Sequence, residues 1–502
     1  MATYKQDSTR LQDYLVADVY VEKINEVHVK VHAEPSIKME MSEYFEFHVP
    51  GYQFMPAYKN RMWDGKIRLL NTMTGMIYAG LTAYVKKFCD TRGYSIDIDI
   101  DPKMLPENQF FENAGYELAK DFDTAFEPHY YQNEAVAHGL YHNRALFLSP
   151  TASGKSFTIY LLARHFVESE GLRVLIIVPT ISLVSQMASD FLEYNKGRPL
   201  NIHKITSGVD KNVDADYTIT TWQSIYKMPQ QWYDRFGVVV GDEAHLFKAK
   251  SLAKILEKTP DIRYRYGLTG SLDDSQTHRL VLEGLFGPVY KVTRTKTLIE
   301  EGKLADFGIK VPILQYDDAS RKVVSKLTYQ EEMDWIVSNH NRNKFIRNLA
   351  HSLKGNTLVL FQYVEKHGKV LLPMLESDDH RIHYVDGSVD AEAREEVRRV
   401  CEATTGNIVL ASYGTFSTGI NIKRLDNVIF ASPSKSKIRN LQSIGRVLRV
   451  GNGKTKATLY DIVDDLQWKS RKNFAVKHFL ERVKIYNDEG FEFKVYNVPM
   501  KG

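Results

Sequence analysis

Short runs of apolar and β-branched residues recur from about residue 145, and they constrain the fold more than any other feature. Each run ends in small or polar residues and precedes a segment of helical composition, the pattern of βαβ units in a parallel sheet. The first series comprises Ala145–Leu148, Val174–Val178, Tyr217–Thr220, Gly237–Val240 and Tyr266–Leu268. The second comprises Thr357–Phe361, Ile382–Val385, Asn407–Ala411, Asn427–Ala431 and Ala457–Tyr460. Two α/β domains are therefore expected, joined near residues 300–315.

The chain before these series has a different pattern. Apolar and polar residues alternate in Val27–Val31 and Ser95–Ile100, which predicts a small α+β module rich in strands. A stretch with Pro, Asn and Gly around Asp101–Gly115 is the expected linker. The expected domains are residues 1–112, 113–305 and 306–502, the last with a basic C-terminal extension.

Composition excludes several classes of protein. A chain of 502 residues with 43% hydrophobic and 25% charged residues is typical of a multidomain globular protein. The two cysteines, Cys89 and Cys401, lie far apart, which argues against a disulfide framework or a zinc site. No apolar run is long enough to span a membrane, so we expect a cytoplasmic protein without a membrane partner. The net charge of +4 gives only weak support for a polyanionic partner.

The first predicted strand leads into Ser149-Pro-Thr-Ala-Ser-Gly-Lys-Ser156, which is followed by the helical segment Phe157–Phe166. In such a strand–loop–helix, successive backbone N–H groups and the helix N-terminus face the phosphates of a nucleotide. Lys155 is expected to reach the β and γ phosphates of ATP, and Ser156 to bind Mg²⁺. Ser149 replaces the first Gly of the usual pattern, and a Gly-Lys-Ser turn also occurs without a nucleotide. The expected phosphate-loop contacts are Thr151, Ala152, Ser153, Gly154, Lys155 and Ser156.

An acidic pair supports the nucleotide site. The apolar segment Val238–Gly241 leads into Asp242-Glu-Ala-His245. Asp242 is expected to bind Mg²⁺ through water, and Glu243 to orient and deprotonate the attacking water. An isolated Asp-Glu pair after a strand often only caps a helix. Downstream of a phosphate loop, the pair instead predicts ATP hydrolysis.

A helical pattern in the second domain carries two arginines. In Gln442-Ser-Ile-Gly-Arg446-Val-Leu-Arg449, the arginines lie three residues apart on one helix face. Guanidinium groups stabilise the charge that develops in phosphoryl transfer, although two such arginines alone would indicate only a solvated face. Because the second domain has no Gly-Lys-Ser loop, we expect one ATP between the domains, with Gln442, Arg446 and Arg449 as catalytic contacts. Domain closure on ATP would then supply a mechanical stroke.

The order of these motifs resembles that of superfamily 2 helicases over roughly residues 125–465. The resemblance implies tandem RecA-like domains and a Q motif at Tyr131-Gln132, in which Gln132 contacts adenine. His129 stands where Arg is common in this motif. Gly419 is implied as a further ATP contact. His245, Thr269 and Ser271 are implied to couple hydrolysis to movement.

The same resemblance implies a set of nucleic-acid contacts in small polar motifs. Each such motif alone would usually only form a turn. In the first domain the implied contacts are Pro179, Thr180, Gln186, Ser207, Gly208, Thr221, Trp222 and Gln223. In the second they are Phe361, Gln362, Asp386, Gly387 and Thr415.

A narrower resemblance, to phage recombination helicases, covers nearly the full length. It rests on Gly51–Phe54, Asn60–Leu70, Pro150–Ser156, Gly414–Gly419 and Lys435–Ile438. It implies remodelling of branched or forked DNA (fork regression, Holliday-junction migration, removal of RNA–DNA hybrids in R-loops). The implied protein is a monomeric motor in the host cytoplasm that works with recombination or single-strand-binding proteins. An RNA helicase and an ATP-regulated binding or annealing protein remain alternatives, although Thr418-Gly-Ile-Asn421 departs from the Arg-Gly-Ile-Asp of many RNA helicases.

Two further segments combine cations with aromatic residues. In the N-terminal module, Lys59, Arg61 and Lys66 are interleaved with Tyr58 and Trp63, which favours contact with nucleic acid, although a small domain also needs aromatics for its core. Near the C-terminus, the basic residues are Lys469, Arg471, Lys472, Lys477 and Arg482. Apolar residues between them predict an amphipathic helix that packs on the second domain and shows its charges to solvent.

Overall fold

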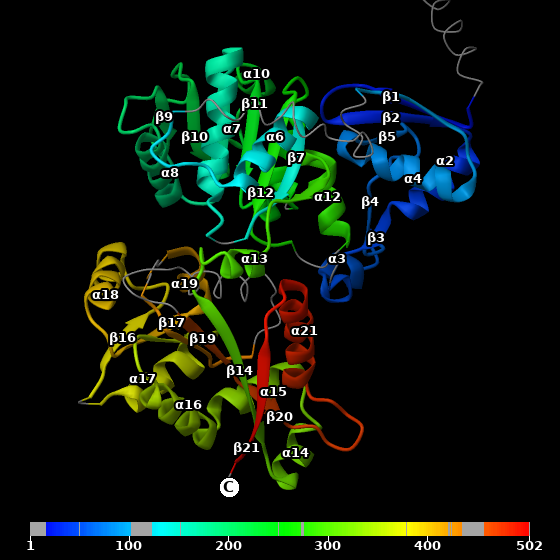
Figure 1. The fold of residues 1–502 in the computed structure, drawn as a ribbon. Helices are drawn as coiled ribbons and strands as arrows, with labels where there is room; N and C mark the ends of the chain where they lie inside the picture. Colours follow the sequence, from blue (N-terminus) through cyan, green and yellow to red (C-terminus); the bar gives the residue numbers. More distant parts are fainter. Residues whose placement is uncertain are drawn as a thin grey trace, which may run out of the picture. The chain divides into compact units, whose positions relative to one another are not determined.

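The computed structural model describes residues 17–49, 51–101, 123–150, 152–248, 250–272, 276–377, 379–419, 422, 424–433 and 456–500 (Figure 1). The chain divides into two compact units: residues 1–149 with 154–292, and residues 150–153 with 293–502. The first unit contains the N-terminal module together with the first parallel-sheet domain. The expected architecture, two parallel-sheet α/β domains preceded by a small α+β module, is confirmed.

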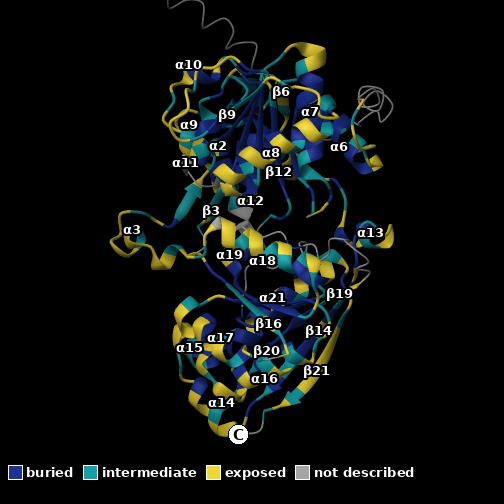
Figure 2. Cartoon of the chain, turned by 90° about the vertical axis from the view of Figure 1, so that its left-hand side faces the viewer, coloured by how far each residue is buried: buried dark blue, intermediate teal, exposed yellow. Residues whose placement is uncertain are grey.

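The N-terminal module is built on a four-stranded sheet of order β5-β2-β1-β6. Its strands are β1 Val19–Lys23, β2 His28–Ala33, β5 Met76–Tyr78 and β6 Ile96–Asp99. Alternate residues of β1 and β2 point into a core that also contains side chains of α2 (Pro35–Tyr44) and α4 (Thr82–Arg92). The hairpin of β3 (Glu46–His48) and β4 (Lys66–Arg68) carries a lobe with η1 (Tyr52–Phe54) and α3 (Pro56–Lys59). Figure 2 shows this lobe to be largely exposed.

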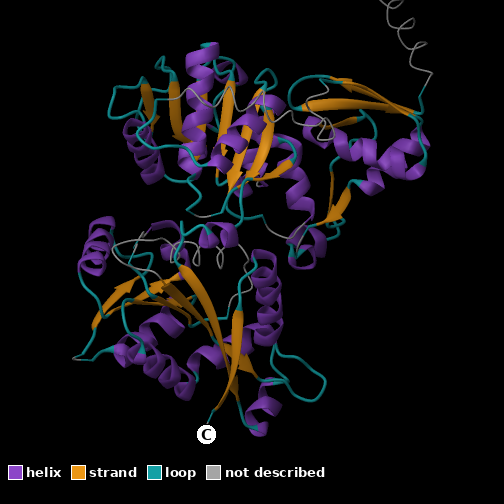
Figure 3. Ribbon diagram, viewed as in Figure 1, coloured by secondary structure: helices purple, strands orange, loops and turns teal. Residues whose placement is uncertain are grey.

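The first parallel sheet has the order β13-β7-β12-β11-β8-β10-β9, and all its pairings are parallel. The strands are β7 Arg144–Leu148, β8 Val174–Val178, β9 Ile202–Ile205, β10 Tyr217–Thr221, β11 Val238–Asp242, β12 Tyr264–Thr269 and β13 Val289–Lys291. All five predicted strands are confirmed, and β9 and β13 were missed. The helices around them are α6 Tyr130–His142, α7 Lys155–Glu170, α8 Ile181–Tyr194, α9 Trp222–Ile225, α10 Gln230–Tyr233, η4 Ala244–Lys248, α11 Lys250–Glu257 and α12 Gln276–Phe286 (Figure 3).

The second unit contains a parallel sheet of order β16-β17-β15-β18-β19-β14-β20, and β21 also pairs with β14. The strands are β14 Asp306–Gln315, β15 Thr357–Phe361, β16 Arg381–Val385, β17 Asn407–Ser412, β18 Asn427–Phe430, β19 Lys456–Asp461, β20 Val463–Asp465 and β21 Phe493–Pro499. The helices are α13 Thr295–Glu300, α14 Asp318–Val324, α15 Tyr329–Ser338, α16 His340–Ser352, η5 Val364–Gly368, α17 Lys369–Leu375, α18 Ala391–Ala403, α19 Tyr413–Gly419 and α21 Phe474–Glu489. All five predicted strands are confirmed.

The predicted junction between the domains overlaps a strand of the second unit. Residues 300–315 were expected to join them, but Asp306–Gln315 forms β14, which pairs with β19, β20 and β21. The compact units instead divide after Val292.

The C-terminal helix α21 packs on the second sheet, as its amphipathic pattern predicted. Buried Glu332 of α15 accepts hydrogen bonds from the backbone N–H groups of Phe474 and Ala475, at 3.1 and 2.9 Å, and from the Asn473 amide at 3.0 Å. Arg482 was expected to face solvent, and this expectation was wrong. Its guanidinium is buried and donates to Asp461 at 2.9 Å.

Candidate nucleotide-binding site and nucleic-acid groove

The predicted motifs of the first domain gather at one edge of its sheet. The phosphate loop follows β7, Asp242 ends β11 and Thr269 ends β12, while other polar motifs follow β8, β9 and β10. Because all these strands are parallel, their carboxyl ends meet at the same edge, where α/β sheets bind ligands.

The phosphate loop has a backbone suited to an anion. Ala152 and Gly154 both have left-handed conformations, with φ of 67° and 79°, and such turns point successive N–H groups in one direction. Ser153 donates its hydroxyl to the Pro150 carbonyl at 2.6 Å. Lys155 lies at the first position of α7, with its ammonium 3.4 Å from the Ser149 carbonyl oxygen. Thr151 lies outside the described residues.

Gln132 lies beside this loop. Its amide nitrogen donates to the Gly154 carbonyl at 3.3 Å, and its amide oxygen accepts from the backbone N–H of His129 at 2.9 Å. The side chain is almost fully buried. Gln132 therefore links the start of α6 to the phosphate loop, and its predicted contact with adenine stays a prediction.

The two predicted Mg²⁺ ligands offer hard oxygen donors. The Ser156 hydroxyl is hydrogen-bonded to the Tyr194 hydroxyl at 2.8 Å. Burial, together with the neighbouring Glu243 carboxylate, raises the pKa of Asp242 to about 7, although Lys155 acts in the opposite direction. A divalent cation beside Asp242 would favour its ionised form. One hydroxyl and one carboxylate fit Mg²⁺, which takes few protein ligands and completes its shell with phosphates and water.

Glu243 is held in a strained backbone conformation next to Asp242. Its φ of 49° lies in the left-handed region, which costs a non-glycine residue free energy and often marks functional sites. Its backbone N–H donates to the Asp242 carboxylate at 2.9 Å.

A chain of close polar contacts joins Glu243 to the motif at the end of β12. His245 Nδ1 lies 3.3 Å from the Glu243 carboxylate and 2.9 Å from the Thr269 hydroxyl oxygen. The single hydroxyl proton of Thr269 is donated to the Ser271 carbonyl at 2.9 Å. His245 Nδ1 must therefore carry the proton that it shares with Thr269. The three residues predicted to couple hydrolysis to movement, His245, Thr269 and Ser271, thus form one connected group.

A polar groove of about 760 Å³ lies at the same edge of the sheet. Six residues predicted to contact nucleic acid line it: Pro179, Thr180, Ser207, Gly208, Thr221 and Gln223. Thr180 is the N-cap of α8, so the positive end of that helix faces the groove. The groove also contains Lys211, which the sequence reasoning missed because no motif surrounds it. Hydroxyls, backbone amides and one ammonium suit the phosphates of a strand and do not read its bases.

Two predicted contacts of the first domain do not line this groove. Gln186 is exposed on α8. Trp222 packs against the hydrophobic core below the groove.

In the second unit, three of the five predicted nucleic-acid contacts are buried. Phe361 is a fully buried core residue stacked on Tyr384, so the predicted contact by its side chain was wrong. Asp386 is buried and accepts hydrogen bonds from Ser388, and Thr415 is buried beside Ser412. Gln362 and Gly387 are exposed at the ends of β15 and β16. Gly419 ends α19, and Gln442, Arg446 and Arg449 lie outside the described residues.

The N-terminal lobe has a second hollow, of about 580 Å³. Lys59 and Arg61, both predicted contacts, line it together with Tyr58 and Trp63. Lys66 lies apart from this hollow and forms an ion pair with Glu46. The lobe also exposes Phe54 and Met62, which are 76% and 75% accessible.

Two structural features are absent from the described part of the chain. None of its helices is both long and apolar enough to cross a lipid bilayer. None of its side chains form a cluster of three or more His, Cys, Asp or Glu residues that could hold a metal ion on their own.

Comparison with known proteins identifies the family. The ATP-dependent DNA helicase UvsW of Enterobacteria phage T4 is 36% identical over 493 residues, which cover 94% of this chain and 98% of the relative. The chain belongs to the UvsW family of ATP-dependent DNA helicases. A family profile for the UvsW N-terminal domain matches residues 18–99, one for the res subunit of type III restriction enzymes matches 125–274, and one for the helicase conserved C-terminal domain matches 341–451.

Solved structures agree with this assignment. The crystal structure of T4 UvsW aligns with a TM-score of 0.51 at 34% identity and covers 96% of this chain and all of that one. The type ISP restriction-modification enzyme LlaBIII bound to DNA aligns with a TM-score of 0.54 at 16% identity over 74% of this chain and 32% of that one. The second alignment shows a shared fold alone.

Proposed function

We propose that this chain of the UvsW family uses ATP hydrolysis to move along DNA and to remodel branched DNA, by fork regression, Holliday-junction migration and R-loop removal. The observation that carries the proposal is the chain of polar contacts from Glu243 to His245 and, through hydrogen bonds, to Thr269 and Ser271. It connects the carboxylate proposed to activate water with the segment that follows β12.

The proposed mechanism assigns a task to each group of the nucleotide site. The phosphate loop and Lys155 bind the phosphates of ATP, and Glu243 orients the attacking water and accepts its proton. Asp242 and Ser156 would hold Mg²⁺, which would neutralise charge on the phosphates. His245, which contacts both residues, couples a change at Glu243 to Thr269. The contributions of Gln442, Arg446 and Arg449 stay predictions from the sequence.

The groove lined by Thr180, Ser207 and Thr221 is the proposed track for one DNA strand. A translocase must pass every sequence, and contacts to the sugar–phosphate backbone allow this because they are independent of the bases. The lobe with Lys59 and Arg61 is the proposed second contact, at which cations and aromatic rings engage a junction or an unpaired strand.

The test is steady-state ATP hydrolysis without nucleic acid and with single-stranded DNA, linear duplex, a four-way junction or structured RNA. Glu243→Gln keeps the shape of the site but removes the base, so stimulated hydrolysis should fall by about 10²-fold or more. The control Glu193→Gln changes an exposed carboxylate on α8 and should retain native activity. Stimulation by RNA alone would contradict the proposed DNA substrate, and no stimulation by any nucleic acid would favour an ATP-regulated binding protein.

A further inference from the structure

Two buried arginines lie side by side at the start of strands β7 and β12. Arg144 and Arg265 are 1% and 0% accessible, and the parallel register pairs them directly. Burial lowers the pKa of Arg144 to about 10 and, together with the charge of Arg144, lowers that of Arg265 to about 9. Both groups are therefore charged at neutral pH. Like charges opposite each other destabilise a sheet, and buried charges need compensation.

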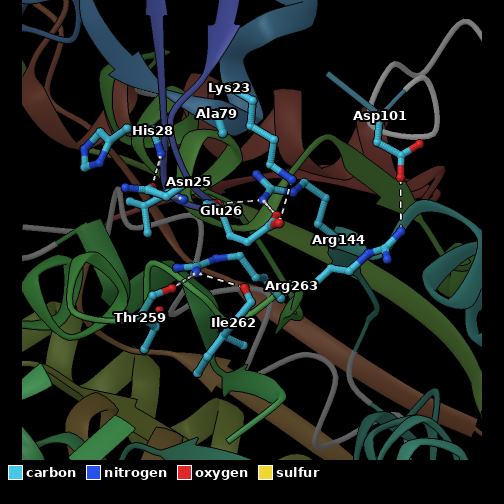
Figure 4. Close-up of polar contacts among 12 residues, drawn as sticks. Lys23, Asn25, Glu26, His28, Ala79, Asp101, Arg144, Thr259, Ile262 and Arg263 are labelled. Carbon is cyan, nitrogen blue, oxygen red and sulfur yellow. Dashed lines mark hydrogen bonds and ion pairs between the residues drawn. The ribbon is translucent and has the colours of Figure 1, made fainter. Parts of the chain in front are cut away.

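The N-terminal module supplies a carboxylate beside this pair of arginines. Arg265 donates to the backbone carbonyls of Leu285, Thr259 and Leu256 at 3.1, 2.8 and 2.8 Å, and among the described residues it forms no ion pair with a carboxylate. Arg144 donates to the Glu26 carbonyl at 2.7 Å, and its guanidinium lies 3.4 Å from the Glu26 carboxylate. Glu26 lies in the turn between β1 and β2, and Figure 4 shows its side chain between Lys23 and Arg144.

The paired strands lead from these arginines to the nucleotide site. Five register pairs connect Arg144 and Arg265 at one end with Leu148 and Thr269 at the other. Beyond the last pair, the Ser149 N–H donates to the Thr269 carbonyl at 2.9 Å, where the phosphate loop begins. Five paired residues span about 13 Å. A displacement at the arginines is therefore transmitted along a short and rigid ladder.

Other contacts hold the module against the same domain. The Glu26 N–H donates to the Pro260 carbonyl at 2.8 Å, in the loop that precedes β12. The Tyr84 hydroxyl donates to Glu283 on α12 at 2.8 Å, and the Tyr78 hydroxyl donates to Glu257 on α11 at 2.6 Å. The module is thus fixed at several points around the start of the ladder.

We propose that Glu26 is a positioning residue for ATP hydrolysis, which fixes Arg144 and thereby places the phosphate loop and Thr269 at the far end of the β7–β12 ladder. The inference rests on the ATP hydrolysis proposed above. The N-terminal module is then an integral part of the ATPase as well as a surface for nucleic acid.

The test compares Glu26→Gln with native protein and with Glu22→Gln in the full chain. Glu22 lies on the adjacent strand β1 and pairs with His32 inside the module, at 2.8 Å, so it serves as the matched control. With saturating single-stranded DNA, Glu26→Gln should lower kcat about tenfold, because a displacement of about 1 Å costs an active site up to about 10²-fold. The DNA concentration that gives half-maximal stimulation should stay within about twofold, since the strand contacts are unchanged. Glu22→Gln should match native protein in both quantities.

A double-mutant cycle with Arg144→Met separates positioning from loss of folding. Glu26→Gln leaves two buried charges without a carboxylate, so removing one of them in Glu26→Gln/Arg144→Met should restore part of kcat. Every variant is assayed well below its measured Tm. A kcat for Glu26→Gln within about twofold of native, or strictly additive losses in the double variant, would overturn the inference while leaving the proposed function intact. Absence of ATP hydrolysis by the native protein would overturn both.

Discussion

Replacement of Gly80 by Ala is expected to weaken the docking of the N-terminal module on α12. Gly80 lies in η2 (Ala79–Leu81), and an added Cβ would lie 2.1 Å from the Glu283 carbonyl oxygen and 2.8 Å from that of Gly284. Non-bonded carbon and oxygen atoms normally stay about 3.3 Å apart or more. The two backbones must therefore separate by about 1 Å, and neither can yield as a flexible side chain could.

Overpacking of this kind costs about 1–3 kcal/mol. At about 2–4 °C per kcal/mol, the expected decrease in Tm is about 2–12 °C. The assay is thermal unfolding of the full chain followed by circular dichroism. Gly308→Ala is the control, because an added Cβ there meets nothing within 4 Å, and its stability should change by less than about 0.5 kcal/mol. A native Tm for Gly80→Ala, or equal shifts for both variants, would refute the argument.

Two further predictions concern buried ionisable groups. Glu332→Gln should lower the free energy of unfolding by about 2–4 kcal/mol, measured by thermal unfolding, because an amide N–H₂ cannot accept the hydrogen bonds at the start of α21. The neighbouring variant Glu331→Gln keeps its capping box, so its free energy of unfolding should decrease by less than about 0.5 kcal/mol. A loss as large for the control would contradict this explanation. Burial, together with the neighbouring His142, lowers the pKa of His138 to about 3. Below about pH 6.5 the unfolded chain therefore gains a proton that the folded chain does not, and the stability of the fold decreases as the pH falls. His138→Phe keeps a ring stacked on Tyr290, and its Tm should decrease less than that of native protein between about pH 7 and pH 5. Equal decreases for the two proteins would exclude His138 as the source of the pH dependence.

The strands that carry the site could be predicted because their sequences are distinctive. Val174–Val178 and Thr357–Phe361 are buried on both faces of a parallel sheet, so they form uninterrupted apolar runs, and the structure has them at the predicted bounds. Strand β14 was missed because Gly308, Lys310 and Pro312 interrupt its apolar pattern. It is nevertheless a strand, since partners pair with it on both edges.

Contacts between distant residues could not be predicted. Phe361 belongs to a motif that favoured contact with nucleic acid, yet nothing in a fully apolar strand shows which face its last side chain takes. The pairing of Glu26 with Arg144 joins residues 118 positions apart. Its one sequence signal is an arginine at the start of the apolar segment Arg144–Leu148, where a buried charge requires a distant partner.

The pairing of β14 has a consequence for synthesis of the chain on the ribosome. In the described sheet, the first strand of the second unit pairs only with β19, β20 and β21, which come last in the sequence. Roughly 140 residues separate Gln315 from Lys456, so at about 5–20 residues per second β14 waits for about 10–30 s before its first partner is made. During that interval both its edges are open to the strands of other nascent chains. The sheet of the second unit should therefore form only after β19 to β21 have been synthesised, and a truncation that removes these strands should yield an aggregating product.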